Sequence, residues 1–259
     1  MMKAAHKCKI VSKTRMGDAV YMVLEAGDMV RTSFTAPGQF VHIKCGDGLL
    51  LRRPISVCSC QEDEPEDTLA VVFEVRGEGT AWLARRPEGH TVDVLGLLGN
   101  GFTMEREGRY LLVGGGIGVP PMRGCAQYTG GRSTAILGFR SREKAILLDC
   151  FRDECAKVAV ATDDGSLGYH GFVDALVCQE LERDRAYDAV LACGPKPMLK
   201  SVAKAAARFG VPCQVSMEER MGCGVGACLV CATPMKDGTV KHVCKDGPVF
   251  DAEEVDWDA

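Results

Sequence analysis

The spacing of four cysteines near the end of the sequence constrains the fold more than any other feature. Cys223, Cys228 and Cys231 lie in one short glycine-rich stretch, and Cys244 follows, giving the pattern C-x4-C-x2-C-x12-C. This is the plant-type spacing, in which four thiolates hold the two irons of a [2Fe–2S] cluster. Glycines between the ligands let the backbone wrap closely around the sulfides. The pattern therefore predicts a [2Fe–2S] centre with these four cysteines as its metal ligands.

Two alternative roles for these four cysteines stay open. Four thiolates also suit a tetrahedral zinc site, although zinc ribbons usually show two paired knuckles, whereas three of these ligands share one loop. The four could instead be buried structural thiols. Cys150 and Cys155 repeat the first spacing without a third cysteine after them. We expect that pair, like most of the remaining cysteines, to pack as small apolar side chains in the core.

The total of 14 cysteines in 259 residues also bears on the cellular compartment. The first residues are polar and lack the apolar segment of a secretory signal, and no stretch approaches the ~18 consecutive apolar residues of a membrane span. We therefore expect a cytoplasmic protein that binds no membrane and keeps its thiols reduced. A net charge of −4 argues against a nucleic-acid binder, which needs a basic face.

Composition and turn signals divide the chain into three segments. Residues 1–103 contain short apolar runs separated by glycine and proline, which predicts an antiparallel β-barrel. Residues 104–215 alternate apolar strands with helices, which predicts a parallel sheet built of βαβ units. Its helices are expected at 121–129, 172–181 and 197–209. Residues 216–259 hold nine acidic and four basic side chains and are too short for a core of their own, so we expect a metal centre to hold them together.

The first segment contains two signals for a flavin site. Arg53-Pro54-Ile55-Ser56 places a guanidinium and a hydroxyl at the start of a strand, where the arginine can pair with a phosphate and the serine can bind a flavin ring. Gly79-Thr80 opens a helical stretch whose free amides suit a pyrophosphate. Each motif alone is also a common strand entry or helix N-cap. Their order ahead of a nucleotide domain favours FAD.

The second segment contains the signals for a nicotinamide nucleotide. A strand that ends in Gly114-Gly115-Gly116-Ile117-Gly118 and continues into a helix is where dinucleotide phosphates approach the backbone. Asp163 follows a second strand and Cys193-Gly194-Pro195 a third, so all three loops are expected at the carboxyl edge of one sheet. Each loop alone is also explained by its turn residues. Their convergence predicts an NAD site made of Gly114, Gly115, Gly116, Gly118, Asp163, Cys193, Gly194 and Pro195.

These motifs, in this order, resemble the ferredoxin–NADP⁺ reductase superfamily. The stretches Glu218-Glu-Arg-Met-Gly-Cys-Gly-Val-Gly-Ala-Cys228 and Val243-Cys-Lys-Asp-Gly-Pro-Val-Phe-Asp251 are similar to the electron-transfer subunits of type 1B dihydroorotate dehydrogenases, and the resemblance covers essentially the whole chain. It implies a FAD-binding barrel, an NAD-binding domain and a C-terminal [2Fe–2S] domain, with the same four cysteine ligands. It also implies a partner, the FMN-containing catalytic subunit, in a heterotetramer with two copies of each. The flavin contacts that it implies are Arg53, Pro54, Ile55, Ser56, Val72, Phe73, Glu74, Gly79 and Thr80.

The resemblance also implies a path for electrons in de novo pyrimidine (UMP) biosynthesis. Dihydroorotate would reduce FMN in the partner, electrons would cross the cluster one at a time, and FAD would hand a hydride to NAD⁺. Cys193 would lie near the nicotinamide and Glu218 near the flavin as candidate catalytic residues, although Glu218 could equally be a solvated surface side chain. We assign no role to the five histidines. No motif in the chain suggests a site for dihydroorotate itself.

Two other functions stay open. The chain could serve another NAD(P)H-linked flavin and iron–sulfur complex, such as a bifurcating transhydrogenase or a sulfide dehydrogenase. Arg140 and Arg142 follow a strand and could meet the 2′-phosphate of NADP, so the sequence leaves NAD and NADP open. The chain could also be a zinc-stapled, nucleotide-sensing binding module without turnover. An absorption spectrum discriminates between these, because flavins and iron–sulfur clusters absorb visible light and zinc does not.

Overall fold

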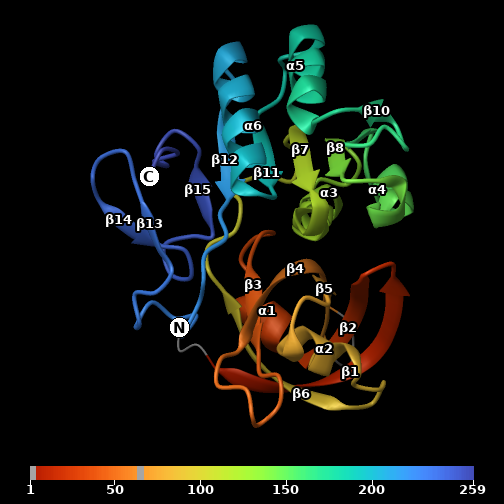
Figure 1. Ribbon diagram of the computed structural model, residues 1–259, viewed down its shortest axis with the longest axis vertical. Coiled ribbons are helices and arrows are strands. Elements are labelled where there is room, and N and C mark those ends of the chain that lie inside the picture. Colours follow the sequence, from red (N-terminus) through yellow and green to blue (C-terminus); the bar gives the residue numbers. More distant parts are fainter. Residues whose placement is uncertain (1–3, 63–66) are drawn as a thin grey trace.

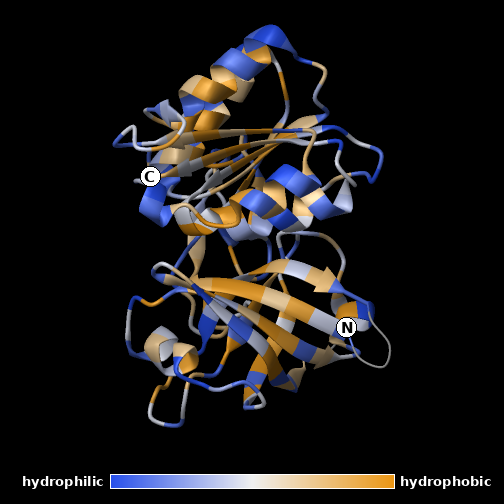
Figure 2. Ribbon diagram, turned by 90° about the vertical axis from the view of Figure 1, so that its right-hand side faces the viewer, coloured by the Kyte–Doolittle hydropathy of each residue, from blue (hydrophilic) through white to orange (hydrophobic). Residues whose placement is uncertain are grey.

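The protein consists of a barrel and a helix-covered sheet stacked along its long axis, with the C-terminal segment beside both (Figure 1). The computed structural model describes residues 4–62 and 67–259. Figure 2 shows apolar residues concentrated on the strands of both bodies and polar residues on the outer turns of the helices. None of the helices in these described ranges is long and apolar enough to cross a membrane.

The barrel is closed and antiparallel, with the described strands in the order β1-β2-β5-β4-β3-β6. Side chains alternate along each strand, so Val41 and Ile43 of β3 and Ile55 and Val57 of β4 all point into one buried apolar core. The strands are β1 (Ala5–Met16), β2 (Ala19–Gly27), β3 (Phe40–Ile43), β4 (Arg53–Gln61), β5 (Asp67–Glu74) and β6 (Thr91–Leu98). Two short helices, α1 (Met29–Ser33) and α2 (Glu78–Ala84), complete this body.

The second body is a sheet with the strand order β10-β9-β8-β7-β11-β12-β15. All of its neighbouring strands are parallel except β12 and β15, which pair antiparallel. The strands are β7 (Tyr110–Gly115), β8 (Thr134–Phe139), β9 (Lys157–Thr162), β10 (Tyr169–His170), β11 (Ala189–Cys193), β12 (Cys213–Ser216) and β15 (Val249–Asp251). The barrel and this sheet confirm the fold class predicted from the sequence.

Helices cover both faces of the sheet, which explains the continuous apolar runs of its strands. Leu111 and Val113 of β7 face α5 (Val173–Arg183) and α6 (Lys196–Phe209) in one core cluster. Leu112 faces the other way, toward α3 (Val119–Tyr128) and α4 (Leu148–Glu154). Short 3₁₀ turns, η1 (Gly116–Gly118) and η2 (Arg142–Lys144), follow β7 and β8.

The C-terminal segment has no separate apolar core among the described residues. Its hairpin, β13 (Ala232–Pro234) and β14 (Val240–His242), is small, and β15 joins the edge of the sheet instead. Cys231, Cys244 and Val255 are buried in the same cluster as the strands and helices of the sheet. The segment also holds the connection that leaves the barrel, because the side-chain Nδ2 of Asn100 donates hydrogen bonds to the carbonyls of Lys245 (3.2 Å) and Asp246 (3.0 Å).

Helix α3 joins the two bodies. It packs on β4, where a β-carbon on Gly124 would lie 3.2 Å from the carbonyl oxygen of Cys58. Arg123 donates to the hydroxyl of Tyr21 in the barrel at 3.2 Å and pairs with Glu154 of α4 at 2.8 Å. The carboxyl edge of the sheet is therefore held against the strands of the barrel that carry the predicted flavin motifs.

Candidate functional site

The two flavin motifs of the barrel meet in space. Arg53 begins β4 and Gly79 lies in α2, and a β-carbon on Gly79 would lie 2.5 Å from Nε of Arg53 and 2.8 Å from its Cζ. A larger residue there would displace the guanidinium. Thr80 has a local function as well, because its hydroxyl accepts hydrogen bonds from the amides of Arg76 (3.0 Å) and Gly77 (3.2 Å) and so caps α2.

The side chains of the other residues predicted to bind the flavin lie on different faces of their strands. Pro54 is exposed and Ser56 is half-buried, so both point away from the barrel interior. Ile55 and Phe73 are buried in the barrel core, which leaves only their backbone groups for a ligand. Val72 packs on the opposite side, in the cluster beneath α3, and Glu74 forms an ion pair with Arg76 at 2.6 Å. The side chains that face outward beside Arg53 are therefore those of Pro54 and Ser56.

The loops after β7 and β11 interlock at the carboxyl edge of the sheet. We call residues 114–118 the nucleotide loop. A β-carbon on Gly118 would lie 2.4 Å from the carbonyl oxygen of Cys193, and one on Gly115 would lie 2.3 Å from Sδ of Met198. Gly194, with φ near +159°, has the same tight contact with Met198. These glycines are required first by the packing of one loop on the other.

Gly116 is the exception in this loop. Its φ is +55°, and a β-carbon there would meet nothing within 4 Å, so the backbone is open on that side. Gly114 resembles the others, because a β-carbon there would lie 2.9 Å from Cα of Val119. Pro195 precedes α6 and lies beside Gly115. An approaching phosphate would thus find open backbone at Gly116.

Asp163 lies at the same edge but away from these two loops. It follows β9, which is separated from β7 by β8, so about 10 Å of sheet lies between the two loops at the usual strand spacing. Its side chain is exposed, and its amide donates to the carbonyl of Phe139 at 3.1 Å. Nearby, Nε of Arg142 donates to the carbonyl of Ser166 at 3.1 Å, so this arginine is already engaged in its own loop.

Cys193 ends β11 in a small polar group. Its register partner on β12 is Ser216, whose side chain is hydrogen-bonded to the thiol, and the charge of Glu218 lies within electrostatic range. Burial raises the pKa of Cys193 to about 12, although the hydrogen bond with Ser216 lowers it. The group is therefore a neutral thiol at physiological pH. Ser216 was not predicted from the sequence, where it is one serine at the end of a short apolar run.

The four cysteines predicted as metal ligands come together in two pairs. We call residues 222–231 the cluster loop. Sγ of Cys228 accepts a hydrogen bond from the amide of Cys223 at 3.4 Å, and Sγ of Cys223 accepts one from the amide of Cys228 at the same distance. Sγ of Cys231 likewise accepts one from the amide of Cys244 at 3.4 Å. A [2Fe–2S] cluster takes two thiolates at each iron, so two pairs of sulfurs fit its donor set.

Backbone amides surround the sulfurs of the cluster loop. The amides of Val225 (3.4 Å) and Ala227 (3.2 Å) also donate to Sγ of Cys223, and that of Gly226 donates to Cys244 at 3.1 Å. Burial raises the pKa of Cys223, but these amides outweigh it and lower the pKa to about 6. Amide donors favour the thiolate, which is the form that ligates iron. Within residues 4–62 and 67–259, no three His, Cys, Asp or Glu side chains converge as a single-ion site requires.

One residue beside the cluster loop was missed by sequence reasoning. His42 of β3 is fully buried, and a β-carbon on Gly224 would lie 2.6 Å from Nδ1 of its ring. A lone histidine in an apolar strand gives no signal in the sequence, because the contact joins two distant parts of the chain. The buried ring thus lies where the barrel meets the cluster loop.

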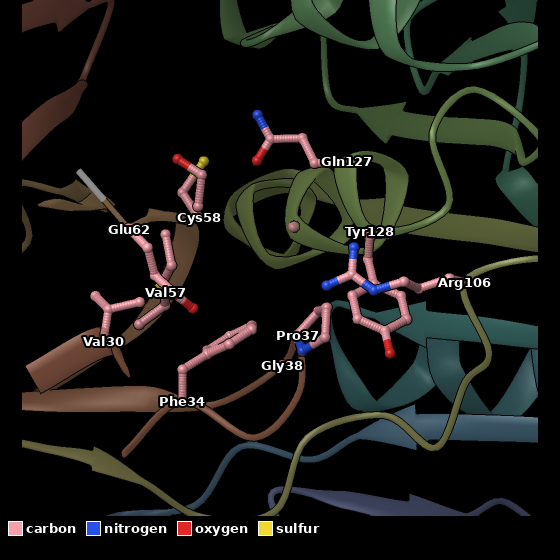
Figure 3. Close-up of a pocket in the computed structure, with 13 residues that line it drawn as sticks. Val30, Phe34, Pro37, Gly38, Val57, Cys58, Glu62, Arg106, Gln127 and Tyr128 are labelled. Atoms are coloured by element: carbon pink, nitrogen blue, oxygen red, sulfur yellow. The ribbon is translucent and has the colours of Figure 1, made fainter. Parts of the chain in front are cut away.

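A cavity on the other side of α3 lies apart from these groups (Figure 3). It measures about 270 Å³ and is lined by residues of the barrel and of α3, among them Phe34, Cys58 and Tyr128, and by Arg106 of the connection between β6 and β7. None of the described residues that line it belongs to the predicted flavin, nucleotide or cluster sites.

Comparisons with known proteins agree with this geometry. The family model described as the iron-sulfur cluster binding domain of dihydroorotate dehydrogenase B matches residues 218–256. The chain is 41% identical, over 95% of its length and 96% of the relative, to the dihydroorotate dehydrogenase B (NAD(+)) electron transfer subunit of Geobacillus thermodenitrificans (strain NG80-2). The same subunit from Bacillus velezensis (strain DSM 23117 / BGSC 10A6 / LMG 26770 / FZB42) is 41% identical over 98% of this chain and 99% of its own.

Solved structures show the same fold. An NADH-dependent reduced ferredoxin-NADP oxidoreductase, described in connection with flavin-based electron bifurcation, superposes with a TM-score of 0.85 at 33% identity, covering 99% of this chain and 92% of its own. A ferredoxin NADP+ reductase from Neisseria gonorrhoeae with bound FAD and NADP superposes with a TM-score of 0.63 at 16% identity, covering 80% of this chain and 92% of its own. The second likeness concerns the fold alone.

Proposed function

The chain belongs to the family of dihydroorotate dehydrogenase B electron transfer subunits, and we propose that it carries electrons from a catalytic partner through a [2Fe–2S] cluster and FAD to NAD⁺. The partner would hold FMN and the dihydroorotate site, in a heterotetramer with two copies of each chain. The observation that carries this proposal is the arrangement of the four cysteines in two pairs, with amide donors aimed at Cys223 and Cys244.

The three cofactors supply complementary chemistry, because a nicotinamide exchanges a hydride, an iron–sulfur cluster exchanges single electrons, and a flavin does both. The chain would hold them at fixed positions. Arg53, lying against Gly79, would bind the FAD pyrophosphate, and Ser56 on the outward face of β4 would hydrogen-bond the flavin ring. Cys223, Cys228, Cys231 and Cys244 would hold the cluster.

The nucleotide would bind at the carboxyl edge of the sheet. The open backbone at Gly116 suits the phosphates of NAD, and the interlocked loops after β7 and β11 hold that backbone in place. Cys193, Ser216 and Glu218 would then face the nicotinamide and the flavin. The neutral thiol of Cys193 would act by hydrogen bonding and packing rather than as a nucleophile. Asp163 would lie beside the part of the nucleotide that is remote from Gly116.

The cluster loop itself carries exposed apolar side chains, and we propose their surface as the docking surface of the catalytic partner. Val225, Leu229 and Val230 are 37%, 60% and 55% exposed, and they lie between ligand cysteines. Adjacent exposed apolar side chains on a soluble body commonly mark an interaction site. Docking there would cover these side chains and bring the partner within reach of the cluster.

The three segments predicted from the sequence, 1–103, 104–215 and 216–259, are proposed as the FAD, NAD and cluster parts. The last strand of the barrel ends at Leu98 and the first strand of the sheet begins at Tyr110. The third part shares the core of the sheet, so we regard it as a segment that depends on its neighbours. Because its thiols must stay reduced to hold iron, we also propose a cytoplasmic location.

The proposal is tested by purifying the tagged chain from its native cells under anaerobic conditions. We expect an FMN-containing partner to co-purify, visible absorption from flavin and cluster, and oxidation of NADH that depends on orotate. Arg53→Ala should lose FAD while the cluster remains, and Arg53→Lys should retain part of it. A colourless, zinc-loaded protein, or the absence of a flavoprotein partner, would contradict the proposal.

A second candidate function has a specific observation in its favour. The 33% identical structure that superposes over 99% of this chain is an NADH-dependent reduced ferredoxin-NADP oxidoreductase. A chain of that kind would couple NADH to ferredoxin and NADP rather than to orotate. Assaying the purified complex with orotate and, separately, with reduced ferredoxin and NADP⁺ separates the two functions, since each predicts activity in only one assay.

A further inference from the structure

His42 occupies a position that the proposed function does not use. Its neighbours in β3, Val41 and Ile43, point into the barrel core, so His42 points outward with Phe40. Phe40 packs in the same apolar cluster as Cys244. The outward face of β3 therefore carries the C-terminal segment, and His42 is the polar side chain on that face. It is 0% exposed.

The imidazole of His42 packs directly on the cluster loop. A β-carbon on Gly224 would lie 2.6 Å from Nδ1 of His42, and Gly224 has a φ of +73°, so only glycine is accommodated there. The carbonyl of Cys223 lies beside the ring. Within the barrel, His42 lies opposite Pro54 of the flavin motif. The ring thus bridges the strand pair that carries the flavin motif and the loop that carries the cluster ligands.

Within the described part of the chain, neither Nδ1 nor Nε2 of His42 makes a well-aligned hydrogen bond, although the carbonyls of Arg52 and Cys223 lie near the ring. An imidazole carries at least one N–H donor in either protonation state. Buried polar groups in native proteins are nearly always hydrogen-bonded, which points to an acceptor outside the polypeptide.

We propose that His42 is a positioning residue that docks the cluster loop on the flavin barrel and presents an N–H donor to the sulfur atoms of the [2Fe–2S] site. This inference rests on the proposed function, in which the four cysteines hold that cluster. Hydrogen bonds to the sulfurs of a cluster help to set its reduction potential, and a donor stabilises the more negative, reduced form. His42 keeps its proton and is not oxidised. Its hydrogen bond changes the one-electron equilibrium between the cluster and the flavin.

The test compares two substitutions in the full chain within its complex. His42→Leu keeps an apolar side chain of similar reach and removes the donor, whereas His42→Gln keeps a neutral N–H donor. The readouts are iron and sulfide per chain and the reduction potential of the cluster, measured by EPR-monitored titration with the potential of FAD as the internal reference. His90→Gln is the matched control, because the ring of His90 packs edge-on against Trp82.

We expect His42→Leu to move the one-electron equilibrium about tenfold away from the cluster and toward FAD, which corresponds to about 59 mV for a one-electron couple. His42→Gln should recover most of that shift, and His90→Gln should leave the potential unchanged. Unchanged potentials in both His42 variants, with full iron and sulfide content, would overturn the inference and leave the proposed function intact. Wild-type protein without iron and sulfide would overturn the proposed function itself.

If His42→Leu does not fold or cannot hold iron, the result for His42→Gln tests the inference. Full iron content and a near-wild-type potential in His42→Gln support the inference. The same loss of iron in both variants contradicts it, because the amide donor would then have no effect.

Discussion

The nucleotide loop and the cluster loop are both rich in glycine, but they use it for different reasons. In the nucleotide loop, positions 115 and 118 are occupied by glycine because neighbouring atoms fill the space where a β-carbon would lie. In the cluster loop, Gly224 and Gly226 have φ values of +73° and +81°, which turn successive amides toward the cysteine sulfurs. The first loop is shaped by protein packed against protein, and the second is shaped around a group that the protein must bind.

The cysteines of the two regions differ in the same way. Burial dominates at Cys193 and raises its pKa to about 12, whereas amide donors outweigh burial at Cys223 and lower its pKa to about 6. One thiol is a small apolar side chain with a single polar neighbour, and the other is prepared to be a thiolate ligand. The local supply of N–H donors therefore separates Cys223 from the core cysteine Cys193.

The largest effect should come from Cys223→Ser. Loss of this thiolate leaves one iron with an incomplete donor set, so we expect the cluster to be absent and orotate-dependent NADH oxidation to fall by more than the ~10–100-fold typical of changes to groups that merely support ligands. Iron and sulfide analysis with the NADH assay measures it. Cys150→Ser is the control, since Cys150 shares the four-residue spacing with Cys155 but lies in the sheet body. A cluster of normal content in Cys223→Ser would show that the ligand assignment is wrong.

Gly224→Ala should have the next largest effect. The new methyl group would lie 2.6 Å from Nδ1 of the buried His42 at a φ of +73°, so the cluster loop must move away from the barrel. We expect cluster retention to weaken about tenfold or more, within the range for groups that orient metal ligands. Gly238→Ala is the control for the strain of a positive φ alone, because Gly238 has a φ of +80° and a β-carbon there would meet nothing within 4 Å. Equal cluster loss in the two variants would mean that contact with His42 is unimportant.

Two alanine substitutions in the nucleotide loop separate packing from ligand access. Gly118→Ala places a methyl group 2.4 Å from the carbonyl oxygen of Cys193, which is backbone that cannot rotate away, so we expect a loss of about 3 kcal/mol in the free energy of unfolding. Gly116→Ala meets no neighbour, and its φ of +55° should cost only about 1 kcal/mol. Thermal unfolding should therefore show the larger decrease for Gly118→Ala, at roughly 2–4 °C per kcal/mol.

The dissociation constant for NADH, measured by titration of the folded variants, should change in the reverse order. Gly116→Ala crowds the open backbone where the phosphates would approach, so its dissociation constant should rise more than that of Gly118→Ala. A Gly116→Ala protein that binds NADH as tightly as the wild type would remove Gly116 from the site.

Local patterns in the sequence were enough to predict the barrel, the sheet and the loops at its carboxyl edge. The helix expected at 197–209 matches α6 (Lys196–Phe209), because its apolar side chains repeat along one face and Gly210 ends it. Strand β15 was not predicted, since Val249–Asp251 is a short run whose pairing with β12 depends on the tertiary fold. Helices α1 and α4 were also missed, because each covers fewer than two and a half turns and gives little periodic signal.

The candidate site was predictable where the chemistry lies within one short stretch. The cluster cysteines and the glycines at 114–118 are of that kind. The contact of Arg53 with Gly79, the pairing of Cys193 with Ser216 and the contact of His42 with Gly224 each join distant segments. No local pattern encodes them, so they became visible only in the folded chain.

Burial should protect the thiol of the nucleotide region from alkylation. Burial holds the pKa of Cys193 at about 12, so at pH 8 only about one molecule in 10⁴ carries the thiolate, against roughly a quarter for an ordinary cysteine. Iodoacetamide should therefore modify Cys193 about 10³-fold more slowly in the native protein than in urea, as measured by mass spectrometry of its peptide. Because the folded state holds this proton above its ordinary pKa, the native labelling rate should rise about tenfold per pH unit up to pH 12. Native labelling as fast as in urea would contradict the comparison, because Cys193 would then be a reactive thiol like Cys223.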